Sequence, residues 1–291
     1  MLKKSRYIFS LLLILTLGLE GKSLLYKVSS KESTVYILGS IHLAKPELYP
    51  LDEAITKAYE KSDVLVVEVD PSSEESISMM KEVMLDSGIY PPDMSLQMQL
   101  SEKTYSSLIT YAKKGGFSID EIQRMRPWVV MLQLTMAEMI RLGYSPELGI
   151  DKYFLDKARA DKKSVVELET AAEQMALLSK DDEAFQDKLL LYTLESMIEL
   201  EPLLMTMFVS WQKGDSDALE KIISLPLDED PGLQVIYDEL ITKRNYKMSE
   251  KIEALLKSDK DCFVVVGSGH VVGKEGIVSL LRQKGYTLVQ E

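Results

Sequence analysis

The chain has 291 residues, of which 46% are apolar, and its formal net charge is −12. This length and apolar content suffice for one large domain or two small ones, each with a sizeable core. The acidic balance argues against a nucleic-acid partner, because binding to backbone phosphates depends on clustered lysine and arginine. Cys262 is the only cysteine, so an intrachain disulfide is excluded, and its place at the head of an apolar run predicts a small buried side chain.

Residues 1–22 have the pattern of a signal peptide. Lys3, Lys4 and Arg6 form a basic start, and the uncharged apolar stretch 8–19 that follows is shorter than the ~20 residues needed to span a bilayer. The segment lacks the Ala-x-Ala pattern of a cleavage site. We therefore expect an exported protein of the periplasm or the extracellular space, which contacts a membrane only if this segment stays uncleaved. A buried N-terminal helix is the alternative interpretation.

Short runs rich in β-branched residues predict strands near both ends of the chain. Residues 24–28 and 34–38 should form a hairpin around a polar turn, and 64–69 has the continuous apolar character of a strand covered on both faces. Residues 51–61 carry one apolar helical face, so the region is a strand–helix–strand unit with an expected right-handed crossover. Further strands are predicted at 164–169, 262–266 and 286–289.

Helical patterns fill the middle of the chain. Residues 119–142 suggest one long helix, which Pro127 should kink or restart, and its methionine-rich face suits core packing better than a peptide or lipid groove. The clearest loop is 225–232. We therefore expect an α/β (α+β) fold, with a mixed central sheet built from N- and C-terminal strands and a large helical insertion at about 72–150 and 172–258.

Both histidines of the chain follow predicted strands in the same setting. They end the motifs Gly39-Ser40-Ile41-His42 and Gly267-Ser268-Gly269-His270, in which glycine lets the backbone turn sharply and leaves room for a ligand. Two acids, Glu68 and Glu169, also stand at strand ends. Because functional groups gather at the carboxyl ends of parallel strands, these four side chains are expected to share one crevice.

Two imidazoles and one or two carboxylates are a common ligand set for zinc and also suit iron, manganese or cobalt. The helical His-Glu-x-x-His motif is absent, and neither Ser40 nor Ser268 lies in a Gly-x-Ser-x-Gly motif. Simpler interpretations remain. Each histidine could simply form a hydrogen bond with a neighbouring loop. Glu68 could form a structural ion pair with Arg244, a polar residue between apolar residues of the predicted last long helix.

Ordered motifs along most of the chain resemble the TraB/GumN family, which includes the Tiki-type metalloproteases. They are Leu38–His42 with Leu48–Leu51, Val67–Asp70, Asp151–Phe154, Glu167–Thr170 with Glu173-Gln174, Arg244-Asn245, and Val266–His270 with Gly285-Tyr286. The resemblance implies an α/β fold in which paired Gly-x-x-His motifs form a metal centre, with residues 23–291 as a single domain. For Tiki members it also implies divalent-metal peptidase activity.

The leading hypothesis is a metal-dependent hydrolase that acts on a peptide or protein. His42, His270 and Glu68 or Glu169 would bind Mn, Co or Zn, and the other glutamate would serve as general base. Arg244 would stabilise the developing oxyanion, and Asn245 would orient the substrate or a ligand. The alternative is a non-catalytic cell-envelope protein that binds a peptide or a metal-containing ligand. A third is a structural protein in which Glu68 pairs with Arg244.

Overall fold

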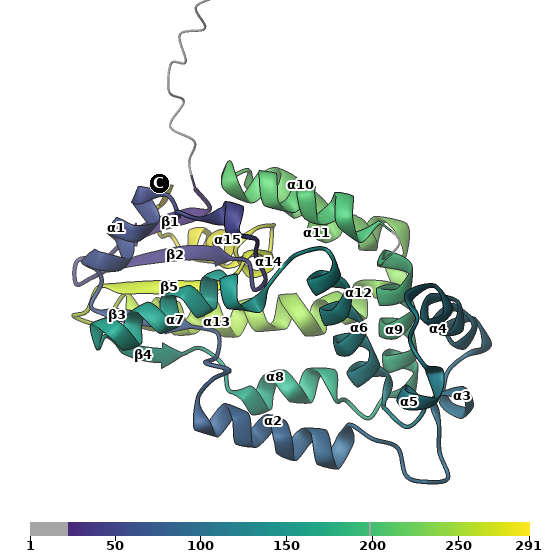
Figure 1. Cartoon of the computed structure of the whole chain (residues 1–291). Coiled ribbons are helices and arrows are strands. Elements are labelled where there is room, and N and C mark those ends of the chain that lie inside the picture. Colours follow the sequence, from purple (N-terminus) through teal and green to yellow (C-terminus); the bar gives the residue numbers. More distant parts are fainter. Residues whose placement is uncertain (1–22, 198) are drawn as a thin grey trace, which may run out of the picture.

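The computed structural model describes residues 23–197 and 199–291, so the predicted signal peptide lies outside the described residues. Its described strands form one six-stranded sheet with the order β4-β3-β5-β2-β1-β6 (Figure 1). The strands are β1 Leu25–Ser29, β2 Thr34–Ser40, β3 Val64–Val67, β4 Ser164–Glu167, β5 Cys262–Gly267 and β6 Leu288–Gln290. The predicted mixed sheet, built from both ends of the chain, is confirmed.

The strand directions place both histidine motifs at one edge. β1 runs antiparallel to β2 and β6, whereas β2, β5, β3 and β4 run parallel to one another. The register pairs Val35 with Cys262 and, five residues on, Ser40 with Gly267, so the two Gly-Ser-x-His turns leave the sheet side by side. The carboxyl ends of β3 and β4 meet at the same edge, which is where α/β sheets bind their ligands.

Helices fill the long connections between these strands. They are α1 Glu53–Lys61, α2 Glu74–Ser87, α3 Leu96–Gln99, α4 Glu102–Gly115, α5 Ile119–Ile122, α6 Pro127–Arg141, α7 Ile150–Asp161, α8 Ala171–Leu178, α9 Glu183–Ser196, α10 Leu200–Gln212, α11 Ser216–Glu229, α12 Gln234–Tyr237, α13 Lys243–Leu255, α14 Ser268–Val271 and α15 Ile277–Gln283. A π-helical segment, Asp238–Thr242, joins α12 to α13. In the described chain no helix is both long and apolar enough to cross a membrane.

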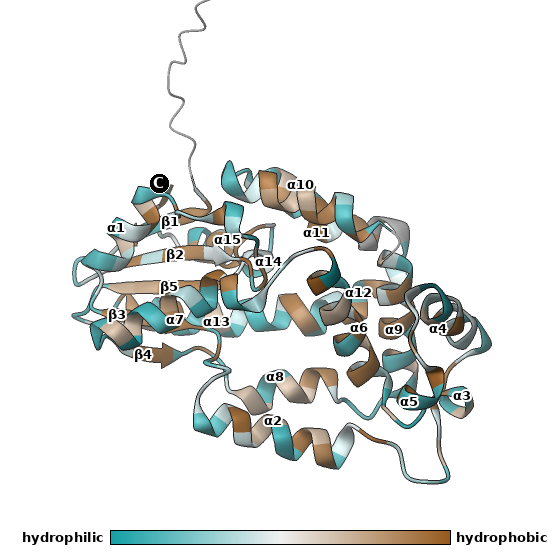
Figure 2. Ribbon diagram, viewed as in Figure 1, coloured by the Kyte–Doolittle hydropathy of each residue, from teal (hydrophilic) through white to brown (hydrophobic). Residues whose placement is uncertain are grey.

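Three hydrophobic clusters among the described residues stabilise this arrangement, the smallest of them around Phe185, Leu189, Leu233 and Ile236. The largest lies around the sheet, where every residue of β3 and β5 is buried and the strands appear apolar in Figure 2. Phe154 of α7 packs on this sheet, with its ring centroid 4.8 Å from that of Phe263 and 5.2 Å from that of Tyr59. The second core lies among the helices and includes Leu108 of α4, Val130 of α6 and Leu190 of α9.

Three local predictions need correction or refinement. Pro127 does not kink a long helix but begins α6, because proline fits the first helical position, where its missing N–H is not needed. The predicted loop 225–232 is wrong at its start, since α11 continues to Glu229. The methionines of α6 differ in burial: Met139 is buried, whereas Met136 is 40% exposed. Only part of the methionine-rich face therefore packs in the core.

Candidate metal centre

The backbone around His42 is fixed by close packing. The indole N–H of Trp211 donates to the carbonyl oxygen of Gly39 at 2.6 Å. The backbone N–H of Ile150 donates to the carbonyl oxygen of Ile41 at 3.0 Å. A β-carbon on Gly149 would stand 2.2 Å from the carbonyl oxygen of His42, so glycine is needed there for close approach. The start of α7 is thereby held against the first Gly-Ser-x-His turn.

Asp151, in the first turn of α7, orients the imidazole of His42. Its Oδ2 lies 2.9 Å from Nδ1 of His42, and its Oδ1 accepts a hydrogen bond from the Ser40 hydroxyl at 2.8 Å. The Asp151 carboxylate raises the pKa of His42 to about 9, although the His42 side chain is 60% exposed. With Nδ1 engaged, Nε2 is the nitrogen that His42 presents to the centre of the site.

His270 is held in the same way from the other side. The Ser268 hydroxyl donates to the carbonyl oxygen of Ser40 at 2.8 Å and so ties the two turns together. Nδ1 of His270 lies 2.6 Å from Oδ1 of Asn245, whose amide donates to the carbonyl oxygen of Glu275 at 2.8 Å. This second bond assigns Oδ1 as the acceptor, so Nδ1 donates and Nε2 is unprotonated. Burial lowers the pKa of His270 to about 4.

Glu68 lies between the two histidines just beyond β3. Its Oε1 accepts a hydrogen bond from the N–H of Gly267 at 2.6 Å and lies 3.9 Å from Nε2 of His270. Its Oε2 accepts from Nη2 of Arg244 at 2.6 Å. Burial opposes the charged form of Glu68, but the charges of His42 and Arg244 and the hydrogen bond from the Gly267 N–H hold its pKa below the usual value. The site therefore holds a buried carboxylate rather than a carboxylic acid at neutral pH.

Arg244 joins Glu68 to Glu169. Its Nη2 donates to Oε2 of Glu169 at 2.6 Å, and its Nε donates to Oε1 of Glu169 at 2.9 Å. The side-chain amide of Gln174, in α8, donates to Glu68 at 3.3 Å and to Glu169 at 3.0 Å. The carbonyl of Leu240, in the π-helical turn before α13, accepts a hydrogen bond from Nη1 of Arg244 at 2.9 Å. Such π turns are frequent at functional sites.

The structure brings together the residues that the sequence singled out: His42, Glu68, Glu169, Arg244, Asn245 and His270. The Glu68–Arg244 ion pair, proposed as a structural alternative, is present. Sequence reasoning missed the orienting contacts of Asp151, Ser40 and Gln174. Two signals pointed to Asp151: it opens the motif Asp151–Phe154, and it stands three residues from Phe154 and so shares a helix face with it.

The donor set can be tested for a metal ion. Among residues 23–197 and 199–291, no group of three or more His, Cys, Asp or Glu side chains is already arranged to hold one. However, a β-carbon on Gly267 would lie 3.3 Å from Nε2 of His42, 3.3 Å from Oε1 of Glu68 and 3.7 Å from Cδ2 of His270. These atoms surround a space that glycine leaves open.

The spacing in this cluster is close to what an ion requires. Two ligand atoms at ~2.1 Å from a tetrahedral ion are about 3.4 Å apart, whereas Oε1 of Glu68 and Nε2 of His270 are 3.9 Å apart. Both histidines also use Nδ1 for an oxygen partner and direct Nε2 to this space, as histidine ligands of metals do. Because the pKa of His42 is raised to about 9, its Nε2 would have to lose a proton when an ion binds. The side-chain types of His42, Glu68 and His270 thus suit a divalent ion, and the Glu68–His270 pair stands wider than two ligands of a bound ion would.

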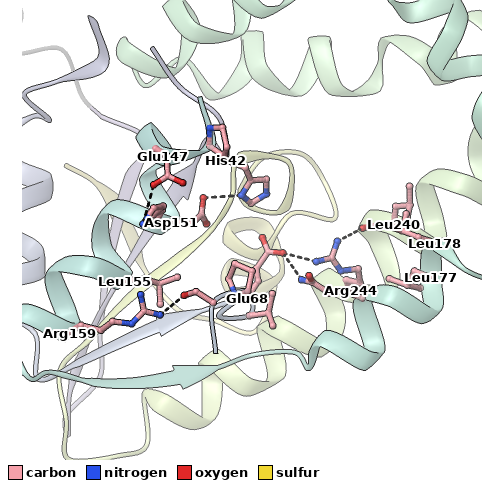
Figure 3. A pocket seen from close by; sticks show the side chains of 16 residues that line it. His42, Glu68, Glu147, Asp151, Leu155, Arg159, Leu177, Leu178, Leu240 and Arg244 are labelled. Carbon is pink, nitrogen blue, oxygen red and sulfur yellow. Dashed lines mark hydrogen bonds and ion pairs between the residues drawn. The ribbon is translucent and has the colours of Figure 1, made fainter. Parts of the chain in front are cut away.

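A cavity of about 630 Å³ opens beside this cluster. Figure 3 shows His42 and Asp151 on one side of it, Glu68 and Arg244 in the middle, and Leu177, Leu178 and Leu240 beyond Arg244. Its size lies within the range of ligand-binding pockets. The cluster is therefore accessible to a molecule from solvent.

Parallel strands that carry two oriented histidines and a buried glutamate at their carboxyl ends define an α/β protein with a candidate metal centre. The chain belongs to the TraB/PrgY/gumN family, whose sequence profile matches residues 24–290, and the resemblance seen in the motifs is confirmed. The chain is 27% identical to the uncharacterized protein YbaP of Escherichia coli strain K12 over 250 aligned residues. This alignment covers 85% of the chain and 87% of YbaP.

Two metalloproteases are more distant relatives. The chain is 23% identical to metalloprotease TIKI1 of Danio rerio over 307 residues, which cover 86% of this chain and 60% of TIKI1. A stretch of 50 residues is 46% identical to metalloprotease TIKI2 of Xenopus tropicalis and covers 16% of this chain and 10% of TIKI2. No solved structure matches the chain significantly.

Proposed function

We propose that this protein is an exported hydrolase of the periplasm or extracellular space that cleaves peptides or proteins with the help of a divalent metal ion. The observation that carries the proposal is the convergence of His42, Glu68 and His270 around the space left by Gly267, beside a cavity that His42 and Glu68 line. The names of the TIKI relatives add support, since both are metalloproteases.

In this proposal His42, Glu68 and His270 hold the ion, which would be Mn, Co or Zn. A divalent ion held there would supply Lewis acidity, which polarises a carbonyl group and eases the ionisation of water. Asp151 and Asn245 keep the two imidazoles in the tautomer and orientation that present Nε2. Asn245 is buried behind His270, so it orients a ligand rather than the substrate.

Arg244 and Glu169 act beside this set. Arg244 lines the cavity next to Glu68, where a guanidinium can stabilise negative charge that develops on a carbonyl oxygen. Because Glu68 is the glutamate nearest the histidines, Glu169 remains the candidate general base. Both oxygens of Glu169 accept from Arg244 in this arrangement, so that role requires Arg244 to release one of them.

Removal and return of the metal tests the proposal. Protein purified without chelator should contain close to one Mn, Co or Zn per chain by elemental analysis, and hydrolysis of a peptide library should stop with chelator and return with the ion. His42→Ala and His270→Ala should each lower activity at least about 100-fold. Peptide binding without cleaved product in mass spectrometry would instead support the non-catalytic binder, and activity indifferent to both substitutions would refute the proposal.

Gly267→Ala should weaken metal binding without unfolding the protein. Its backbone angles, φ −51° and ψ 140°, are open to alanine, but the new methyl group would enter the space among the three ligands. We expect an affinity about 10- to 100-fold lower in calorimetric titration with Mn²⁺ or Zn²⁺. Gly269→Ala in the same motif is the matched control, because its β-carbon would meet only Ile241 and Ile223, at 3.6 and 3.8 Å. Equal affinities for the two variants would contradict this placement of the ion.

A further inference from the structure

Helix α8 carries apolar side chains that the fold covers only in part. Its sequence is Ala-Ala-Glu-Gln-Met-Ala-Leu-Leu, yet none of its residues is buried. Helix α2, which lies beside it in Figure 1, buries only Ser76. A surface helix of a globular protein normally buries its apolar stripe against the core. Helices α2 and α8 contact each other, so the partly covered apolar side chains of α8 either pack on α2 or border open space.

The cavity beside the candidate metal centre decides between these possibilities. Leu177 and Leu178 of α8 line it, together with Leu240 of the π-helical segment (Figure 3). Gln174, which holds Glu68 and Glu169, stands three and four residues before the two leucines and so lies on the same helix face. One face of α8 thus presents both a polar contact to the site and an apolar wall to the cavity.

Three charged side chains that line the cavity are already in ion pairs with neighbouring residues. Lys152 is paired with Asp156 at 2.7 Å, and Arg159 is paired with Asp70 at 2.6 Å. Glu147 lies 3.4 Å from Lys152. Each of these cations already has an acidic partner, so an acidic substrate residue would compete with an existing pair. The leucines have no such competing partner in the cavity.

We propose that the cavity selects peptides with an apolar side chain of about leucine size, which binds on Leu177, Leu178 and Leu240 while the neighbouring peptide bond lies over His42 and Glu68. The cleavage part rests on the proposed function, whereas the binding preference does not. Burial of one such side chain gives a preference of at least about tenfold over a charged residue.

Labelled peptides that differ at one residue test this preference. Fluorescein-labelled Ala-Ala-Xaa-Ala-Ala, with Xaa as Leu, Asp or Lys, is titrated with the whole protein in chelator, and binding is followed by fluorescence polarisation. The Leu peptide should bind at least about tenfold more tightly than the other two. Leu177→Asp should reverse the order so that the Lys peptide binds best, a gain that misfolding cannot produce. Leu85→Asp on α2, where Leu85 is 82% exposed and outside the cavity lining, should keep the wild-type order.

Equal binding of the three peptides to the wild type, or an unchanged order in Leu177→Asp, would overturn the inference. The same peptides incubated with Mn²⁺ or Zn²⁺ separate it from the proposed function. Selective binding without any cleavage would leave the apolar preference standing and refute the hydrolase. Cleavage at equal rates for Leu, Asp and Lys would support the hydrolase and refute the apolar preference.

Discussion

Glu68→Gln is expected to abolish metal binding and peptide hydrolysis in a protein that still folds. The neutral amide can still accept the hydrogen bond from the Gly267 N–H, but it lacks the charge that a divalent ion requires. We expect metal affinity and activity to fall at least about 100-fold, because even changes one shell away from a metal cost 10- to 100-fold. Calorimetry and the peptide assay measure both effects.

The same variant separates the metal site from the structural ion pair. Arg244 keeps Glu169 as a partner in Glu68→Gln, so the free energy of unfolding should fall by only about 1–2 kcal/mol. Urea denaturation without metal checks this value. If Glu68→Gln only lowers stability and the wild type binds no metal ion, then Glu68 has only a structural role in the ion pair with Arg244. The proposed function would then be wrong.

Arg244→Ala should have the largest effect on stability. It leaves Glu68 and Glu169, whose side chains are 9% and 6% exposed, without their cation. Removal of one partner from a buried ion pair costs about 3–5 kcal/mol, and we expect a loss of that size in urea denaturation at pH 7. The exposed neighbour Lys243, which pairs with Glu239, supplies the control Lys243→Ala, with a loss below about 1 kcal/mol.

The pH dependence of Arg244→Ala has a definite sign. In the wild type the pKa of Glu68 is lowered, so its charged form stabilises the fold above the unfolded pKa of about 4.3, and this stabilisation is lost as pH falls through the lower folded value. Without Arg244, burial favours the protonated acid. The deficit of the variant should therefore be greatest near pH 7 and shrink towards pH 4. A deficit that is constant with pH would show that lost packing, not charge, is responsible.

The sheet was predictable because its strands carry a local signal. The β-branched runs at 64–67 and 262–267 are apolar at every position, as strands covered on both faces must be. The helical region was less predictable. Pro127 allows either a kink or a start, and only the packing around it selects the start. Pro226 suggested a loop, yet the chain there continues as α11.

The histidines and glutamates of the site were predictable for a topological reason. All of them follow strands, and parallel strands bring their carboxyl ends to one edge. The residues that hydrogen-bond to them, Asp151 and Gln174, were not predictable in this way. They reach the site from helices whose rotation depends on tertiary packing. Arg244 could be named from the sequence, but its choice between an ion pair and the substrate depends on where the two carboxylates lie.

The π-helical turn Asp238–Thr242 makes the length of this segment as important as its composition. Each residue of an α-helix turns the chain by about 100°. Deletion of one residue here would relax the turn to α-helix and rotate α13 against α12, so that Arg244 and Asn245 could not both reach their partners. Among related chains, insertions and deletions should accumulate in the surface connections between helices, while the distance from Gln234 to Asn245 stays constant.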